Sequence, residues 1–257
     1  MDLLEKPSFS CLCEIGRKNI ENRKAQLKKL GYDMEFEKPQ KARGGVAIIY
    51  RKEFDLEPRN DLKMKKPTNT NILDFENIWH ETVIKGIGPT VIGVVYKHPN
   101  STIAGLKMFK NLLQESLEKV NAEKKSCILL GDINIDGMKI SKNEVRDVFE
   151  MTLENNFIPL VTMPTRIQKD TCSTIDHIFI NSTLIRKTHT RISGNLYADL
   201  SDHLPNFLVL GYRKPLQLKE NRPKIRIFSD KNTENFNKSL STADWSEVYQ
   251  TENPDKV

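Results

Sequence analysis

The pattern that most constrains the fold is a helical stretch between two strand-like stretches. Apolar residues at positions 106, 109, 112, 113, 117 and 120 share one helical face, and a short apolar strand follows at residues 127–130. A β-branched run, residues 90–96, precedes them. Strand, helix and strand in this order imply a layered α/β domain.

Further periodic stretches extend this domain. Helices are predicted over residues 17–30, closed by Gly31, and over residues 143–155; strands are predicted at 46–50, 75–84, 175–180 and 204–210. Periodicity ends after Gly211, so we expect one domain over residues 1–211 and a connector over 212–257. Within the connector, Phe236, Leu240 and Trp245 have near-helical spacing and predict a short helix without a core of its own.

Composition excludes several classes of protein. No apolar run approaches the roughly 18 residues of a membrane span, and four scattered cysteines in 257 residues do not make a disulfide scaffold. We therefore expect a reduced, intracellular protein. The net charge of +6 permits a polyanionic partner without requiring one.

Three polar clusters lie next to predicted strands, where α/β folds usually place their sites. They are residues 131–134, which include Asp132 and Asn134, residues 173–177, which include Asp176, and residues 201–203, which end in His203. Asp132 and Asn134 suit a hydrated cation and a phosphate, although an Asx turn that caps the strand explains them as well.

Asp176 and His203 are the aspartate and histidine that we expect to pair, because a carboxylate from one strand can fix the tautomer of an imidazole from another. Ile175 and Ile178 indicate that His177 is set differently along its strand. The competing interpretation is an ordinary loop hydrogen bond. Zinc-protease, nucleophile-elbow and P-loop motifs are absent from the sequence.

Together the clusters resemble the endonuclease/exonuclease/phosphatase superfamily, which includes deoxyribonuclease I and apurinic/apyrimidinic endonucleases. The resemblance rests on Glu14 after residues 11–13, and on residues 44–47, 96–100, 131–134, 173–177 and 201–203 in this order. Residues 164–167 ahead of 173–179 make the chain more similar to the endonuclease domain of non-LTR (LINE-like) retrotransposon polyproteins.

The resemblance implies a deoxyribonuclease I-like fold, a four-layered α/β sandwich of two packed mixed sheets. It also implies a Mg²⁺-dependent (or Mn²⁺-dependent) phosphodiesterase site at one rim. By position, Glu14 and Asp202 would serve the metal, and Asp132 would orient or activate the attacking water. An ordinary charged residue after a strand is the competing interpretation of Glu14.

The other implied roles concern the phosphate. Asn134 would hold the scissile phosphate, Tyr96 would donate to a phosphate oxygen, and Asp176 would orient His203, which would stabilise charge developing on phosphorus. These roles suit phosphodiester cleavage, which needs a positioned nucleophile and neutralised phosphate charge. Candidate substrate-binding residues are Asn100, His98 and Ser173; His98 lies in a loop that either faces DNA or only turns the chain.

The sequence departs from the family at its start. The family begins with a strand that carries an asparagine near the metal, whereas only 13 residues precede Glu14 here. We therefore expect the first strand to be missing, either because the chain is an N-terminally truncated fragment or because this copy of the element has decayed. Its loss would expose a sheet edge.

Three functions follow from the resemblance. The first is a DNA endonuclease that nicks target DNA for retrotransposition, in the nucleus, with a reverse transcriptase domain in the full polyprotein as partner. The second is an inactive remnant that at most binds nucleic acid. The third is a phosphatase or phosphodiesterase of the same fold that acts on an inositol phosphate or phospholipid, against which residues 164–167 argue.

Overall fold

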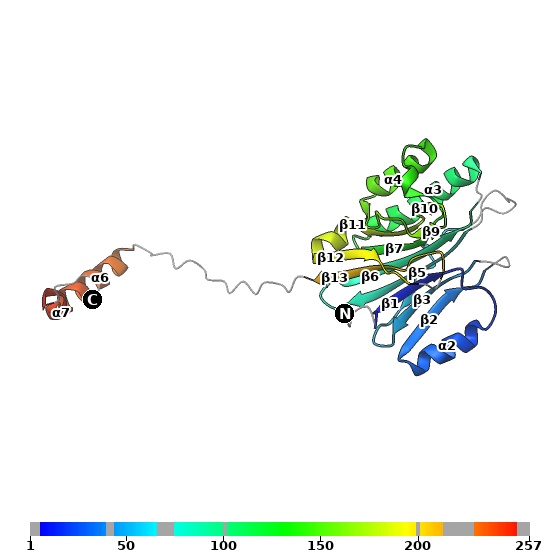
Figure 1. Cartoon of the computed structure of the whole chain (residues 1–257). Helices are drawn as coiled ribbons and strands as arrows, with labels where there is room; N and C mark the ends of the chain where they lie inside the picture. The colour runs from blue at the N-terminus through cyan, green and yellow to red at the C-terminus, as the bar shows by residue number, and fades with distance from the viewer. Residues whose placement is uncertain are drawn as a thin grey trace. The chain divides into compact units, whose positions relative to one another are not determined.

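The computed structural model describes residues 6–39, 44–65, 75–99, 102–198, 201–212 and 229–250. The chain divides into two units, Met1–Lys214 and Pro215–Val257. The first unit contains all the sheets in the described part of the chain (Figure 1). None of the described helices is long and apolar enough to cross a lipid bilayer.

A six-stranded sheet forms the centre of the first unit, in the order β4-β5-β6-β7-β11-β8. Strands β6 and β7 are parallel, and the other neighbours are antiparallel. The six strands are β4 (Glu57–Pro58), β5 (Phe75–Ile84), β6 (Gly88–Lys97), β7 (Ser126–Asp132), β8 (Phe157–Pro159) and β11 (Asp176–Asn181).

Two helices cover one face of this sheet, α3 (Ile103–Ala122) and α4 (Asn143–Glu154) (Figure 1). Helix α3 starts where the Thr102 hydroxyl accepts a hydrogen bond from the Gly105 amide. Its apolar face, which includes Phe109, Leu113 and Leu117, is buried against the sheet. The short helices η1 (Gly137–Lys139) and α5 (Ser182–Lys187) lie in the connections that follow β7 and β11.

The other face carries two smaller sheets. One has the order β1-β3-β2, and the other pairs β12 with β13. Their strands are β1 (Phe9–Cys13), β2 (Tyr32–Glu37), β3 (Val46–Arg51), β12 (Thr188–Asn195) and β13 (Asn206–Tyr212). Helix α2 (Ile20–Lys29) packs on the outside of β2 and β3, so the layers number four, as predicted. The mixed α/β, deoxyribonuclease I-like class is thus confirmed.

Strand β7 shows why the central strands are apolar throughout. Cys127 and Leu129 point to the helices, whereas Ile128 and Leu130 point to the small sheets. A strand that buries both faces needs apolar residues without alternation, and this is the pattern from which it was predicted.

Two short strands complete the first unit, β9 (Arg166–Gln168) and β10 (Thr171–Ser173), which pair with each other. The second unit contains α6 (Asp230–Thr242) and α7 (Ser246–Gln250). Phe236 and Leu240 lie on α6, while Trp245 follows it, and no residue of α6 is buried. The predicted role of this segment as a connector stays a prediction.

Candidate active site

The polar clusters meet because of strand direction. Strands β6 and β7 are parallel, so both end at one edge of the central sheet, and β11 runs the other way and therefore begins there. Asp176, the first residue of β11, is the register partner of Asp132, the last residue of β7. Both side chains lie on the face of the small sheets, since side chains two residues apart share a face. We call this edge the rim.

Gly131 allows β6 and β7 to approach at the rim. A Cβ atom at this position would lie 1.8 Å from the carbonyl oxygen of Val95 and 2.8 Å from its carbonyl carbon. The backbone φ of Gly131, +145°, is also one that other residues rarely adopt. The glycine of residues 131–134 is therefore required by the backbone, and Asp132 follows it directly.

Asp132 is a buried carboxylate at the rim, with 6% of its surface exposed. Its Oδ1 accepts the amide hydrogen of Asn134 at 3.0 Å, which is the Asx turn expected as an alternative. Burial, and after it the charge of Asp176, raises the pKa of Asp132. The charge of Glu14 also raises this pKa. A cation bound here would therefore neutralise negative charge that Asp132, Asp176 and Glu14 bring together.

Asp176 and His203 form the pair that the sequence predicted. His203 Nδ1 lies 2.9 Å from Asp176 Oδ2, so Nδ1–H donates to the carboxylate and leaves Nε2 for other partners. The same Oδ2 accepts the hydroxyl hydrogen of Thr165 at 2.7 Å. Hydrogen bonding to Asp176 raises the pKa of His203, against the effect of burial. The imidazolium is thereby favoured beside the two carboxylates.

The segment that carries His203 is fixed by backbone contacts. Arg166 and His203 form an isolated antiparallel bridge. Leu204 donates its amide to the carbonyl of Thr165 at 2.7 Å, and Ile167 donates to the carbonyl of Asp202 at 3.0 Å. The backbone of His203 is therefore held opposite Arg166 by hydrogen bonds to the residues on either side of that arginine.

Tyr96 and Glu14 form a second pair. The Tyr96 hydroxyl donates to Oε1 of Glu14, which follows β1 with a left-handed backbone (φ 56°). Burial, and after it this hydrogen bond, raises the pKa of Tyr96 well above its usual range, so the phenol stays a proton donor. The end of β1 lies at the rim, because Cys13 Sγ accepts the Asp132 amide at 3.5 Å.

Three of these groups could share a metal ion. Ligand atoms of Asp132, Asp176 and His203 lie within 4.8 Å of one another, the one such group in the described part of the chain. Carboxylate oxygens are the ligands that Mg²⁺ and Mn²⁺ prefer. The raised pKa of Asp132 is the observation that fits a cation, because burial and the neighbouring carboxylates of Asp176 and Glu14 disfavour its ionised form.

Two predicted residues lie apart from this group. Asp202, expected at the metal, is exposed, and its Oδ2 accepts hydrogen bonds from Arg166 Nε at 2.7 Å and Gln168 Nε2 at 3.1 Å. Arg166 thus holds the pKa of Asp202 below its usual range. Ser173, expected to bind substrate, lies in β10 and is half-buried; its carbonyl accepts the amide of Thr165.

Two further predicted residues, Asn134 and His98, lie near the end of β6. The side-chain amide of Asn134 donates to the carbonyl of Lys97 at 2.8 Å, so Asn134 joins the ends of β6 and β7. His98 packs its ring on Tyr96, with centroids 4.7 Å apart. Asn100 lies outside the described residues. His177, set apart in the prediction, is buried and donates through Nε2 to the carbonyl of Ile135.

Sequence reasoning missed Thr165 and Glu76. Thr165 is fully buried and bonds the carboxylate of Asp176. Glu76 lies on β5 opposite Tyr96, and its side chain is 2% exposed. The local sequence does not single out Glu76, because β5 also contains Asn77, His80 and Glu81, and nothing in it links Thr165 to Asp176.

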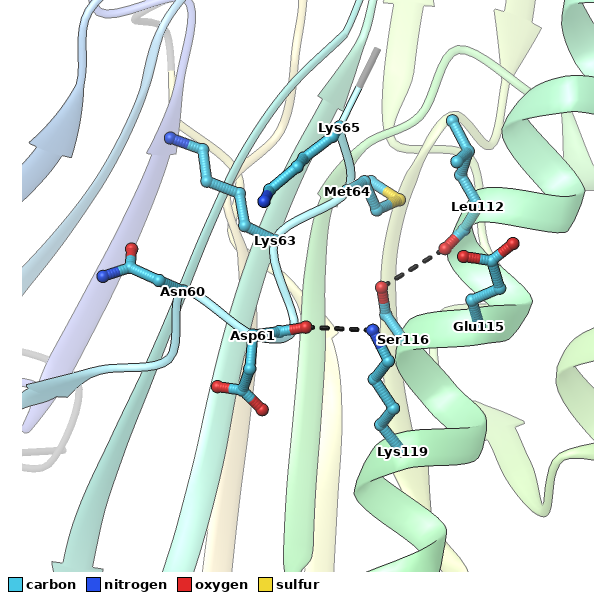
Figure 2. A pocket seen from close by; sticks show the side chains of 9 residues that line it. All are labelled: Asn60, Asp61, Lys63, Met64, Lys65, Leu112, Glu115, Ser116 and Lys119. Carbon is cyan, nitrogen blue, oxygen red and sulfur yellow. Dashed lines mark hydrogen bonds between the residues drawn. The ribbon is translucent and has the colours of Figure 1, made fainter. Parts of the chain in front are cut away.

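One described cavity is separate from these residues. It has a volume of about 290 Å³. Figure 2 shows its lining residues on the segment that follows β4 and on helix α3. Its walls are tied together by Lys119, which donates to the carbonyl of Asp61, and by the hydroxyl of Ser116, which donates to the carbonyl of Leu62. A second cavity of about 210 Å³ adjoins the rim and is lined by Lys97, Asn134 and Asp136, among others.

Comparisons with solved structures agree with this fold. An AP endonuclease from Archaeoglobus fulgidus superposes with a TM-score of 0.58 and 19% identity, over 81% of this chain and 91% of that one. The human Nocturnin catalytic domain gives 0.58 and 18%, over 81% and 82%. The endonuclease domain of TRAS1, a telomere-specific non-LTR retrotransposon, gives 0.58 and 15%, over 82% and 88%.

The sequence itself matches a family model. Residues 2–203 match that of the endonuclease/exonuclease/phosphatase family. The fold and the rim thus define a phosphoester hydrolase scaffold, and the chain belongs to this family. A comparison with curated proteins found no match.

Proposed function

We propose that this protein is a divalent-metal-dependent DNA endonuclease that nicks target DNA for retrotransposition. Nuclear action and a reverse transcriptase domain as partner are parts of this proposal. The observation that carries it is the meeting of Asp132, Asp176 and His203 at the rim. An AP endonuclease and a retrotransposon endonuclease domain are among the structural relatives of this chain.

The residues at the rim suit phosphodiester hydrolysis. Asp132 orients the attacking water, and the imidazolium of His203, held by Asp176, stabilises the charge that develops on the phosphate oxygens. Tyr96, kept protonated, donates to a phosphate oxygen, and the carboxamide of Asn134 contacts the scissile phosphate. Each group is already held by a neighbour, which favours catalysis because little reorganisation is needed.

With His203 protonated, its imidazolium has no lone pair to offer a metal, so Asp132 and Glu14, whose charges act on each other, are the residues that would hold the divalent cation. The cation would supply the charge neutralisation and the activation of water that phosphodiester cleavage requires. We leave Asp202 out of this set because Arg166 already pairs with its carboxylate.

A plasmid-nicking assay tests the proposal. We expect supercoiled DNA to be nicked with Mg²⁺ or Mn²⁺ and to stay intact with EDTA. Asp132→Asn and His203→Ala should lose at least about 100-fold in rate. Exposed residues provide matched controls: Asp147→Asn in α4 and His189→Ala in β12 should keep wild-type rates. Equal nicking by the rim variants would contradict the mechanism.

Two further measurements beside the nicking assay separate the alternative functions, a phosphatase and an inactive remnant. Hydrolysis of a small phosphomonoester without DNA nicking would indicate a phosphatase, a function named for one structural relative from Bacteroides thetaiotaomicron. Salt-sensitive binding of DNA without cleavage would indicate an inactive remnant.

A further inference from the structure

The mechanism proposed above does not use Glu76, although its carboxylate lies one strand away from Tyr96. Glu76 on β5 is the register partner of Tyr96 on β6, so the two side chains share a face. Only 2% of the Glu76 side chain is exposed. A buried carboxylate is costly without a partner, and the structure provides one.

That partner is His98, two residues after Tyr96. His98 Nε2 lies 3.2 Å from Oε2 and 3.4 Å from Oε1 of Glu76. A carboxylate can only accept this hydrogen bond, so Nε2 carries the proton that is shared with Glu76. Among the described residues, only Nε2 of the His98 ring makes a side-chain hydrogen bond. The ring is thereby anchored at one nitrogen.

Gly44 completes the enclosure of this pair. A Cβ atom at Gly44 would lie 2.9 Å from Glu76 Oε2 and 3.1 Å from His98 Nε2. The φ of Gly44 is +112°, a region that other residues rarely adopt. The backbone therefore closes over the point where the carboxylate and the imidazole meet.

The anchored ring leads back to the rim. The rings of His98 and Tyr96 meet edge to face, with centroids 4.7 Å apart and planes at 66°. The Tyr96 hydroxyl in turn donates to Glu14. Glu76, His98, Tyr96 and Glu14 thus form a continuous series of contacts from a buried strand to a candidate metal ligand.

We propose that Glu76 is a positioning residue for this site. By accepting the Nε2–H of His98, it fixes the tautomer and orientation of that ring, and the ring holds the Tyr96 phenol where it meets Glu14 and the phosphate. The effect of Glu76 on catalysis rests on the proposed endonuclease function. The contact with His98 can be tested without that function.

Kinetics test the catalytic consequence. Glu76→Ala should lower kcat by about 10- to 100-fold, as loss of an orienting partner does at comparable sites, with little change in KM. Glu76→Gln should restore most of the rate, because its amide oxygen also accepts Nε2–H. Glu81→Gln is the matched control: Glu81 lies on the same strand but pairs with Arg59 and Lys125, and wild-type kcat is expected.

A double-mutant cycle distinguishes positioning from mere structural support. If Glu76 acts through Tyr96, Glu76→Ala should cost much less in a Tyr96→Phe background than in the wild type. Losses of kcat that multiply would overturn the proposal. Gly44→Ala should reproduce the defect of Glu76→Ala. Gly88→Ala, which has a similar φ of +88° but no atom within 4 Å of its Cβ, should not.

Nitrogen NMR of the His98 ring tests the contact even if the protein cuts no DNA. We expect a fixed Nε2–H tautomer in the wild type and in Glu76→Gln, and a mixture of tautomers in Glu76→Ala. A mixture in the wild type would overturn the positioning role. Absence of nicking together with a fixed wild-type tautomer would refute the endonuclease function while supporting the contact.

Discussion

At the scale of single residues, the rim consists of side chains whose orientation and protonation are set by neighbours from other elements. Asp176 receives hydrogen bonds from Thr165 and His203, and Asp132 is buried beside it. The sequence predicted Asp176 and His203 as a pair, because each lies beside an apolar strand, and the family resemblance implied Asp132 in the same site. It could not predict Thr165, since its contact with Asp176 depends on how β9 and β11 are placed.

Thr165 therefore gives the first prediction. Its Oγ1 donates to Asp176 and accepts the amides of Ile175 at 3.1 Å and Asp176 at 3.0 Å. Thr165→Val keeps the shape but leaves these groups unpaired. We expect a loss of roughly 1–3 kcal/mol in the free energy of unfolding, measured by urea denaturation, and slower nicking. Thr165→Ser retains the hydroxyl, so an equal loss in that variant would contradict this account.

The raised pKa of Asp132 gives a pH-dependent prediction. A carboxyl whose pKa is higher in the folded chain destabilises the fold once it ionises, so the penalty is absent below the unfolded pKa. It grows from about pH 4 to about pH 7, where Asp132 titrates. Without metal, Asp132→Asn should melt like the wild type near pH 4 and at least ~2 °C higher at pH 8.

Differential scanning fluorimetry in EDTA at several pH values measures this difference. Excess Mg²⁺ should narrow it, because a bound cation stabilises the ionised form of the wild type. A difference in Tm that does not change with pH would show that Asp132 titrates normally.

At the scale of elements, what could be predicted depended on burial. The strands β6, β7 and β11 and the helices α3 and α4 have continuous or periodic apolar patterns, and all five were predicted within a few residues. Strand β12 was missed because its sequence, Thr188–Asn195, is largely polar. Strands β9 and β10 have three residues each, too few for a pattern.

The close approach of β6 and β7 gives the prediction at this scale. Gly131→Ala places a methyl group 1.8 Å from the carbonyl oxygen of Val95, so the strands must separate. We expect the variant to lose more than about 3 kcal/mol of stability or to fail to fold. Gly31→Ala, at a φ of +86° with no atom near its Cβ, measures the effect of backbone strain alone. Similar urea midpoints for the two variants would contradict the argument.

At the scale of the whole molecule, the net charge of +6 would favour binding of the substrate if that substrate is DNA. Binding to a polyanion releases counterions, so affinity should fall linearly in a plot of log affinity against log salt. We expect such a fall for duplex DNA bound to Asp132→Asn, measured by fluorescence anisotropy between 50 and 200 mM salt, roughly the range in which this effect is large. A salt-independent affinity would argue against DNA as the substrate.

The pairing of Asp132 with Asp176 makes the site depend on the register of two strands, β7 and β11. Side chains alternate along a strand, so a slip of one residue between β7 and β11 would turn Asp176 into the helical layer and bring His177 out of it. The two carboxylates meet only in one register. The backbone hydrogen bonds between β7 and β11 therefore determine whether the two carboxylates are adjacent. Substitutions that weaken this pairing should abolish activity even when they change no polar side chain of the site.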